Sequence, residues 1–159
     1  MPTQLTQHHY KECHMNNTAS EATSPLKKCQ VDIFITQRLL PGKARDYLFI
    51  SEANKSEHWT RRSKRITAQH KLVWYGLSAK QPPGSIELPC SVVITRYGTK
   101  LYDDDNLIAA MKHVRDATAN FLKPGLAPGK ADDDKRIKWT CLQVATKDKE
   151  QHGIRIEIY

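Results

Sequence analysis

The sequence has 159 residues, with 25 Lys and Arg against 17 Asp and Glu and a formal net charge of +8. This length predicts one domain around a single hydrophobic core, and no run of about 18 apolar residues is present to span a bilayer. The polar N-terminus lacks the basic and apolar segments of a secretory signal, so we expect a cytoplasmic protein with no membrane contact.

The acidic residues are unevenly distributed along the sequence. Six of the 17 lie in two triplets, Asp103-Asp104-Asp105 and Asp132-Asp133-Asp134, and the remainder of the chain is strongly basic. A basic surface around concentrated acidic spots suits a protein that attracts a polyanion and holds a cation against it. A basic protein with two acidic loops and no such role fits the charge equally well.

The four cysteines are widely spaced and form no Cys-x-x-Cys pair, which argues against a zinc ribbon or a redox motif. We expect reduced thiols that mostly fill the core. The four residues are Cys13, Cys29, Cys90 and Cys141.

The first part of the chain predicts a leader followed by strands. Residues 1–28 are polar and without sustained periodicity, which predicts a flexible leader before a domain at 29–159. Alternation of apolar and polar residues at 31–35 predicts a strand. Residues 47–50 favour a second, short strand.

A helix is predicted from about residue 55 to residue 77, because apolar residues recur there at helical spacing. Trp59 lies in phase with Ile66 and Val73, which favours core packing of the Trp59 ring over base stacking. The helix ends at a Pro- and Gly-containing turn.

The next predicted elements are a strand at 86–97 and a helix at 106–122. Pro89 suggests that this strand lies at an edge or begins with a bulge. Apolar residues that step by four and three make 106–122 the clearest helix in the chain.

The last two predicted strands, 136–146 and 153–159, are joined by a turn at 147–152 and suggest a hairpin. The order β(β)-α-β-α-β-β predicts the α+β class, with a mixed sheet and two main helices packed on one side.

The acidic triplets indicate a divalent cation. In an extended backbone Asp103 and Asp105 point the same way, so one cation can bridge them. Asp105 or Asn106 also fits a helix N-cap, but capping needs only one residue. Residues 123–133 are long enough to return the second triplet beside the first, and converging carboxylates favour Mg²⁺ or Mn²⁺.

The pattern around the triplets resembles the RusA family of Holliday-junction resolvases, many of them phage or prophage proteins. It combines Asp103-x-Asp105-Asn106-Leu107 at a helix start with Asp133-Asp134 before a strand. The resemblance covers about residues 30–159 and extends to Lys112-x-x-Arg115-Asp116, Lys147 and the closing Gly153-Ile154-Arg155-Ile156-Glu157-Ile158. Classical short members have a lysine where this chain has Ala109, and Lys112 resembles a phage-type variant.

The resemblance implies a RusA-like fold and a homodimer that resolves four-way DNA junctions by paired nicks in recombination and repair. It implies Mg²⁺ as cofactor, with Mn²⁺ as a substitute, and no small-molecule cofactor. The catalytic residues would be Asp103, Asp105, Asp134 and Lys112, and the metal ligands Asp103, Asp105, Asp133 and Asp134. Within the second triplet Asp134 is favoured as the catalytic residue, then Asp133.

The expected DNA contacts are basic residues on the two helices, because Lys and Arg contacts to phosphate supply most sequence-independent affinity. They are Arg61, Arg62, Lys64, Arg65, Lys112 and Arg115. The basic run at 61–65 is alternatively a solvated helix face. Lys112 shares a helix face with Asp105 and either meets a phosphate or pairs with Asp116.

Two other functions fit the same residues. One is a branched-DNA-binding protein without nuclease activity, for which we expect junction binding that needs no metal. The other is a less selective nuclease that cuts flaps or other branched DNA.

Overall fold

The computed structural model describes residues 11–12, 29–36, 49, 58–126 and 130–159. The predicted leader lies outside these ranges apart from Lys11–Glu12, which form β1. The predicted strand at 47–50 lies outside them apart from Phe49, a buried residue.

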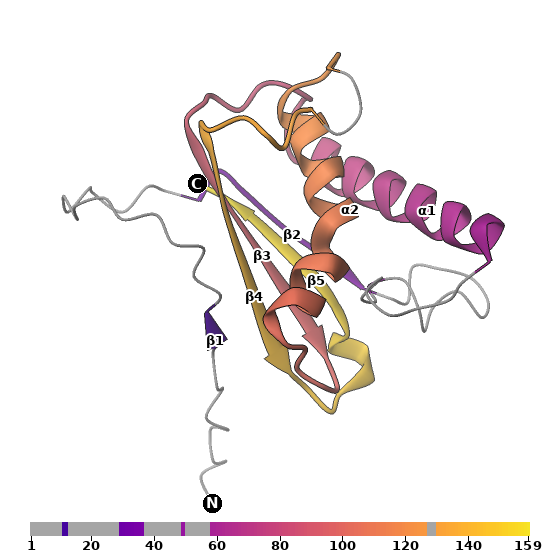
Figure 1. Ribbon diagram of the computed structural model, residues 1–159. Helices are drawn as coiled ribbons and strands as arrows, with labels where there is room; N and C mark the ends of the chain where they lie inside the picture. The colour runs from indigo at the N-terminus through magenta and orange to yellow at the C-terminus, as the bar shows by residue number, and fades with distance from the viewer. Residues whose placement is uncertain (1–10, 13–28, 37–48, 50–57, 127–129) are drawn as a thin grey trace, which may run out of the picture.

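A mixed sheet of five strands in the order β1-β4-β3-β5-β2 forms the described fold (Figure 1). β3 and β4 pair in parallel, whereas the other neighbouring strands are antiparallel. The longer strands are β2 (Val31–Thr36), β3 (Cys90–Gly98), β4 (Ile137–Ala145) and β5 (Gly153–Ile158).

Two long helices, α1 (Trp59–Ser78) and α2 (Asp104–Leu122), lie on one side of this sheet (Figure 1). They pack on each other, and they contact β2 and β4 respectively. The predicted α+β class with a mixed sheet and two helices is therefore confirmed.

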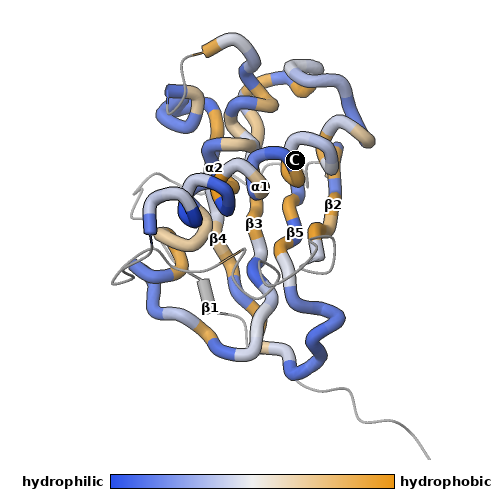
Figure 2. Tube along the Cα trace, turned by 90° about the vertical axis from the view of Figure 1, so that its right-hand side faces the viewer, coloured by the Kyte–Doolittle hydropathy of each residue, from blue (hydrophilic) through white to orange (hydrophobic). Residues whose placement is uncertain are grey.

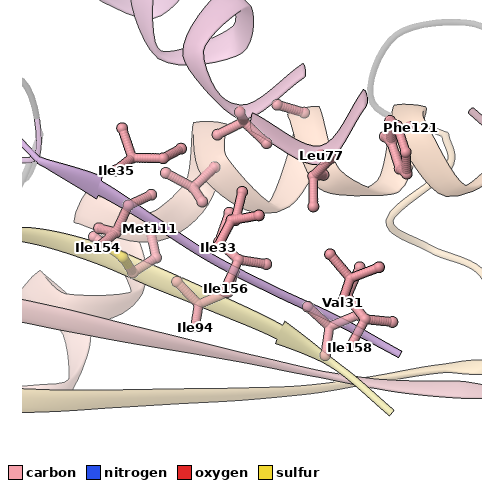
Figure 3. Close-up of a cluster of buried hydrophobic side chains, with 14 of the residues drawn as sticks. Val31, Ile33, Ile35, Leu77, Ile94, Met111, Phe121, Ile154, Ile156 and Ile158 are labelled. Atoms are coloured by element: carbon pink, nitrogen blue, oxygen red, sulfur yellow. The ribbon is translucent and has the colours of Figure 1, made fainter. Parts of the chain in front are cut away.

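The core lies between the helices and the sheet (Figure 3). Ile154, Ile156 and Ile158 occupy every second position of β5, so that all three project toward the helices. They are fully buried beside Met111 and Leu77. Figure 2 shows apolar positions recurring along β2 and β5. Each fully buried aliphatic side chain of this kind contributes about 1.5–3 kcal/mol to folding.

Two predictions about the strands are wrong. The edge position, one of the two alternatives that Pro89 suggested for β3, is excluded because β3 lies between β4 and β5. Pro89 directly precedes the first residue of β3, Cys90. The last two strands form no hairpin, because β3 separates them. Their connection contains a short 3₁₀ helix, η3 (Lys149–Gln151).

The prediction that Trp59 packs in the core is also wrong, because its side chain is 72% exposed. It occupies the first turn of α1, and that end of the helix projects beyond the sheet (Figure 1). Further along the same helix Val73 is fully buried.

Among the described residues, no helix is both long and apolar enough to cross a membrane.

Candidate functional site

The first aspartate triplet lies at the exposed start of α2. Asp103 is the N-cap, and its Oδ1 accepts a hydrogen bond of 2.9 Å from the backbone N–H of Asn106. The cap thus lies at Asp103, and the prediction of Asp105 or Asn106 as the cap is wrong. Asp104 and Asp105 occupy the first helical turn at the surface, where the helix dipole favours negative charge.

The peptide that precedes this triplet is fixed by a buried glutamine on β4. Gln143 is 0% exposed, and its Oε1 accepts from the backbone N–H of Tyr102 at 2.7 Å. Its Nε2 donates to the carbonyl of Tyr102, also at 2.7 Å. A buried amide with both groups paired holds its partner firmly, so Asp103 follows a restrained peptide.

A buried arginine on β3 restrains the same loop from the other strand. The Arg96 guanidinium lies 3.8 Å from the ring centroid of Tyr102, and its Nη1 donates to the carbonyl of Lys100 at 2.9 Å. Neither Arg96 nor Gln143 was among the residues predicted from the sequence. The sequence feature that could have identified them is a polar residue at an inward-facing position of each strand, where an apolar residue is usual.

Asp134 of the second triplet is neutralised by two cations. It accepts hydrogen bonds from Arg136 at Nη2 (2.8 Å), Nε (3.1 Å) and the backbone N–H (3.0 Å), and from Nζ of Lys123. These bonds, those from Arg136 above all, hold the pKa of Asp134 well below its usual range. Asp133 is exposed, and Asp132 is half-buried.

The two triplets lie at opposite ends of α2, so the prediction that they share a metal within one chain is wrong (Figure 1). Asp103 caps the start of the helix, whereas Asp134 is paired with Lys123 at its end. A 19-residue helix spans about 28 Å. Asp103 and Asp105 are thus separated from Asp133 and Asp134.

The physical reason is the parallel pairing of β3 and β4. The first triplet follows the end of β3, and the second precedes the start of β4. Because the two strands run in the same direction, the end of β3 and the start of β4 lie at opposite ends of the strands. Residues 123–133 are long enough to return along α2, but Asp134 lies beside Lys123 at the end of the helix.

The basic residues of α1 divide into two groups. Arg61, Arg62 and Lys64 are exposed and accessible to a polyanion. Arg65 is only 8% exposed, since it belongs to the buried stripe that continues through Gln69 and Val73. The prediction that Arg65 contacts phosphate is wrong for this reason.

On α2 the two residues predicted to contact DNA also differ in exposure. Lys112 is exposed, as a phosphate contact requires. Arg115 is half-buried, and its guanidinium carbon lies 5.1 Å from the ring centroid of Trp139. The packing of this arginine against the sheet gives it a structural role.

A separate group of metal-ligating side chains joins the two helices. His70 of α1 and His113 and Asp116 of α2 each offer one ligand atom, and these atoms lie within 4.8 Å of one another. No sequence pattern predicted the group, because His70 belongs to a different helix and is distant in sequence from the other two residues.

Comparisons of the chain with protein-family models, curated proteins and solved structures give no match.

Proposed function

We propose that the protein is a homodimeric, Mg²⁺-dependent endonuclease that nicks branched DNA, with the four-way junction as its preferred substrate. The observation that carries this proposal is the set of surface aspartates at the start of α2, on a peptide restrained by Gln143 and Arg96. Exposed carboxylates that are adjacent in the sequence suit a hard divalent cation that must also meet a phosphate. The motif resemblance to RusA resolvases supports the same activity.

In this proposal a second protomer adds a further carboxylate to the cation site. Asp103 uses one carboxylate oxygen for its cap, which leaves few ligands beside Asp105. A twofold axis across the middle of α2 would interchange the ends of two such helices. It would bring Asp103 and Asp105 near Asp133 of the partner subunit. Asp133 suits this role better than Asp134, which is neutralised by Arg136 and Lys123.

The residues of this chain have distinct parts in the proposed reaction. Bound Mg²⁺ supplies an activated water and neutralises charge that develops on the scissile phosphate. Asp105 holds the cation, and Lys112 on the exposed face of α2 contacts phosphate. Arg61, Arg62 and Lys64 bind the DNA backbone and orient the junction.

A branched-DNA-binding protein without nuclease activity is the second candidate. Two observations favour it: Asp103 caps α2, and Asp134 pairs with Lys123 and Arg136. Each aspartate therefore has a structural role that needs no metal. This candidate predicts the same junction binding in Mg²⁺ and in EDTA, with no strand cleavage.

Incubation with a synthetic four-way junction and a matched linear duplex, in Mg²⁺ or in EDTA, separates the two functions. We expect nicks in the junction only with Mg²⁺, and at least about a hundredfold slower nicking by Asp105→Asn at unchanged or tighter junction binding. Glu87→Gln, which removes an exposed carboxylate elsewhere, is the matched control. Binding without cleavage by the wild-type protein would favour the second candidate, and equal cleavage of junction and duplex would remove the junction preference.

A further inference from the structure

We propose that His70, His113 and Asp116 form a Zn²⁺ site that joins α1 to α2. The site lies outside the aspartate triplets and goes beyond the proposed nuclease function. Its ligands come from two helices that pack on each other, so a bound ion would connect the basic helix to the helix that carries the aspartates.

The distances between the three side chains are close to those of a zinc site. Nδ1 of His113 lies 3.6 Å from Oδ2 of Asp116, one helical turn away. Zinc bonds of 2.0–2.2 Å in a tetrahedron separate ligand atoms by about 3.3–3.5 Å. The remaining separations, within 4.8 Å, close by about 1.5 Å at most through side-chain rotation.

The state of the imidazoles also suits metal binding. The ring centroids of His70 and His113 are 6.2 Å apart, at an interplanar angle of 48°. Burial, and then the nearby His113, lower the pKa of His70, whereas Asp116 acts in the opposite direction. Nε2 of His70 is buried and has no hydrogen-bond partner within the described part of the chain, a deficit that coordination would remove.

Two imidazole nitrogens and one carboxylate oxygen favour Zn²⁺ over Mg²⁺, which prefers oxygen ligands throughout. Three protein ligands leave a fourth position for water. A surface hollow of about 370 Å³ next to His70 gives water and ions access to the group. It is lined by His70, Lys71, Trp74, Tyr75, Ala117 and Asn120.

The alternative is that the three side chains only pack together, with His113 and Asp116 as an i,i+3 pair on α2 and the ring of His70 tilted beside that of His113. That arrangement predicts no specific uptake of zinc. It also predicts that zinc leaves the stability of the folded protein unchanged, since an ion that does not bind the native state cannot stabilise it.

The test begins with the full chain freed of bound metal by EDTA, from which the EDTA is then removed. Zn²⁺ is titrated into this protein and its binding is followed by calorimetry. Four residues close together in the sequence near the N-terminus also have side chains that bind zinc. All proteins therefore carry His8→Asn, His9→Asn, Cys13→Ser and His14→Asn. In this background we expect one Zn²⁺ per chain, a raised Tm, and no binding of Mg²⁺ at the same site. His70→Gln and Asp116→Asn should each weaken zinc binding at least tenfold, whereas Asn120→Ala, which alters the hollow without removing a ligand, should not.

Substitution of Co²⁺ for Zn²⁺ gives a second measurement that depends on the ligands. We expect visible absorption bands of a four- or five-coordinate Co²⁺ with nitrogen and oxygen ligands, and their loss in His70→Gln. Circular dichroism checks that each variant is folded. If His70→Gln does not fold, Asp116→Asn serves as the ligand variant in its place. Absence of zinc binding in the background protein, or equal binding by all variants, would overturn the proposal.

Discussion

Gln143 links the inner face of β4 to the peptide that begins the aspartate triplet, and its replacement tests whether that link positions the aspartates. In Gln143→Met, of similar volume, the N–H and carbonyl of Tyr102 lose their partners. We expect a loss of about 1–3 kcal/mol in the free energy of unfolding, measured by urea denaturation, because partly buried polar groups are left unpaired. Junction cleavage should fall further than junction binding. Gln30→Met, at an exposed position, should change neither property, and unaffected cleavage in folded Gln143→Met would remove the positioning role.

Asp134 should make stability depend on pH in the acidic range. Arg136 and Lys123 lower its pKa in the folded protein, so the unfolded chain binds the proton more readily. The stabilisation is fully present above the unfolded pKa of about 4 and is lost as the pH falls toward the lower, folded pKa. We therefore expect wild type to be more stable than Asp134→Asn at pH 7, with a difference that shrinks below about pH 4. Urea midpoints at a series of pH values measure this, and a difference independent of pH would exclude the ion pairs as its cause.

At the scale of the helices, we propose that the exposed basic face of α1 supplies sequence-independent affinity for DNA. The double variant Arg61→Ala/Lys64→Ala should weaken binding to every junction sequence alike. The negative slope of log affinity against log salt concentration should become shallower by about 0.9 for each phosphate that the variant no longer neutralises. Stability should hardly change, because exposed charges contribute about 0–1 kcal/mol each.

Arg65→Ala provides the contrast on the same helix. Its side chain is buried in the folded protein, so we expect lower stability. The salt dependence of binding by the folded fraction should stay unchanged. If the double variant instead leaves the salt dependence of binding unchanged, the basic residues of α1 form only a solvated face, and Lys112 remains as the DNA contact.

Elements with a local periodic signal could be predicted from the sequence. The strict alternation of Ile154, Ile156 and Ile158 defined β5, and the spacing of Leu107, Met111 and Val114 defined α2, because one buried face imposes each period. Trp59 fitted the period of α1, yet it lies past the edge of the sheet. Helical phase specifies a face, but it does not specify how far the covering sheet extends.

The sheet order and the relation between the two triplets could not be predicted in the same way. Local pattern does not reveal that β3 inserts between β4 and β5, since strand pairing depends on contacts distant in sequence. The reach of residues 123–133 permitted convergence of the triplets without requiring it. Parallel pairing of β3 with β4 then placed Asp103 and Asp134 at opposite ends of α2.

At the scale of the whole molecule, this separation makes the proposed nuclease depend on assembly. A single chain presents Asp103 and Asp105 without the second triplet, whereas a twofold dimer would form two equivalent sites, each with aspartates from both protomers. Two sites related by symmetry suit paired nicks in opposing strands of a four-way junction. The zinc site proposed between α1 and α2 lies within one chain and is independent of this assembly.

Mixed dimers test the composite site most directly. Asp105→Asn and Asp133→Asn chains, each carrying a different affinity tag, are produced together, and the heterodimer is purified through both tags. If each site combines Asp105 of one protomer with Asp133 of its partner, the heterodimer contains one wild-type site and one doubly substituted site. We predict that each variant homodimer binds the junction without cleaving it, and that the heterodimer regains Mg²⁺-dependent nicking of one strand per junction. A folded heterodimer that binds the junction but remains inactive, beside a wild-type dimer that cleaves it, would contradict the composite site.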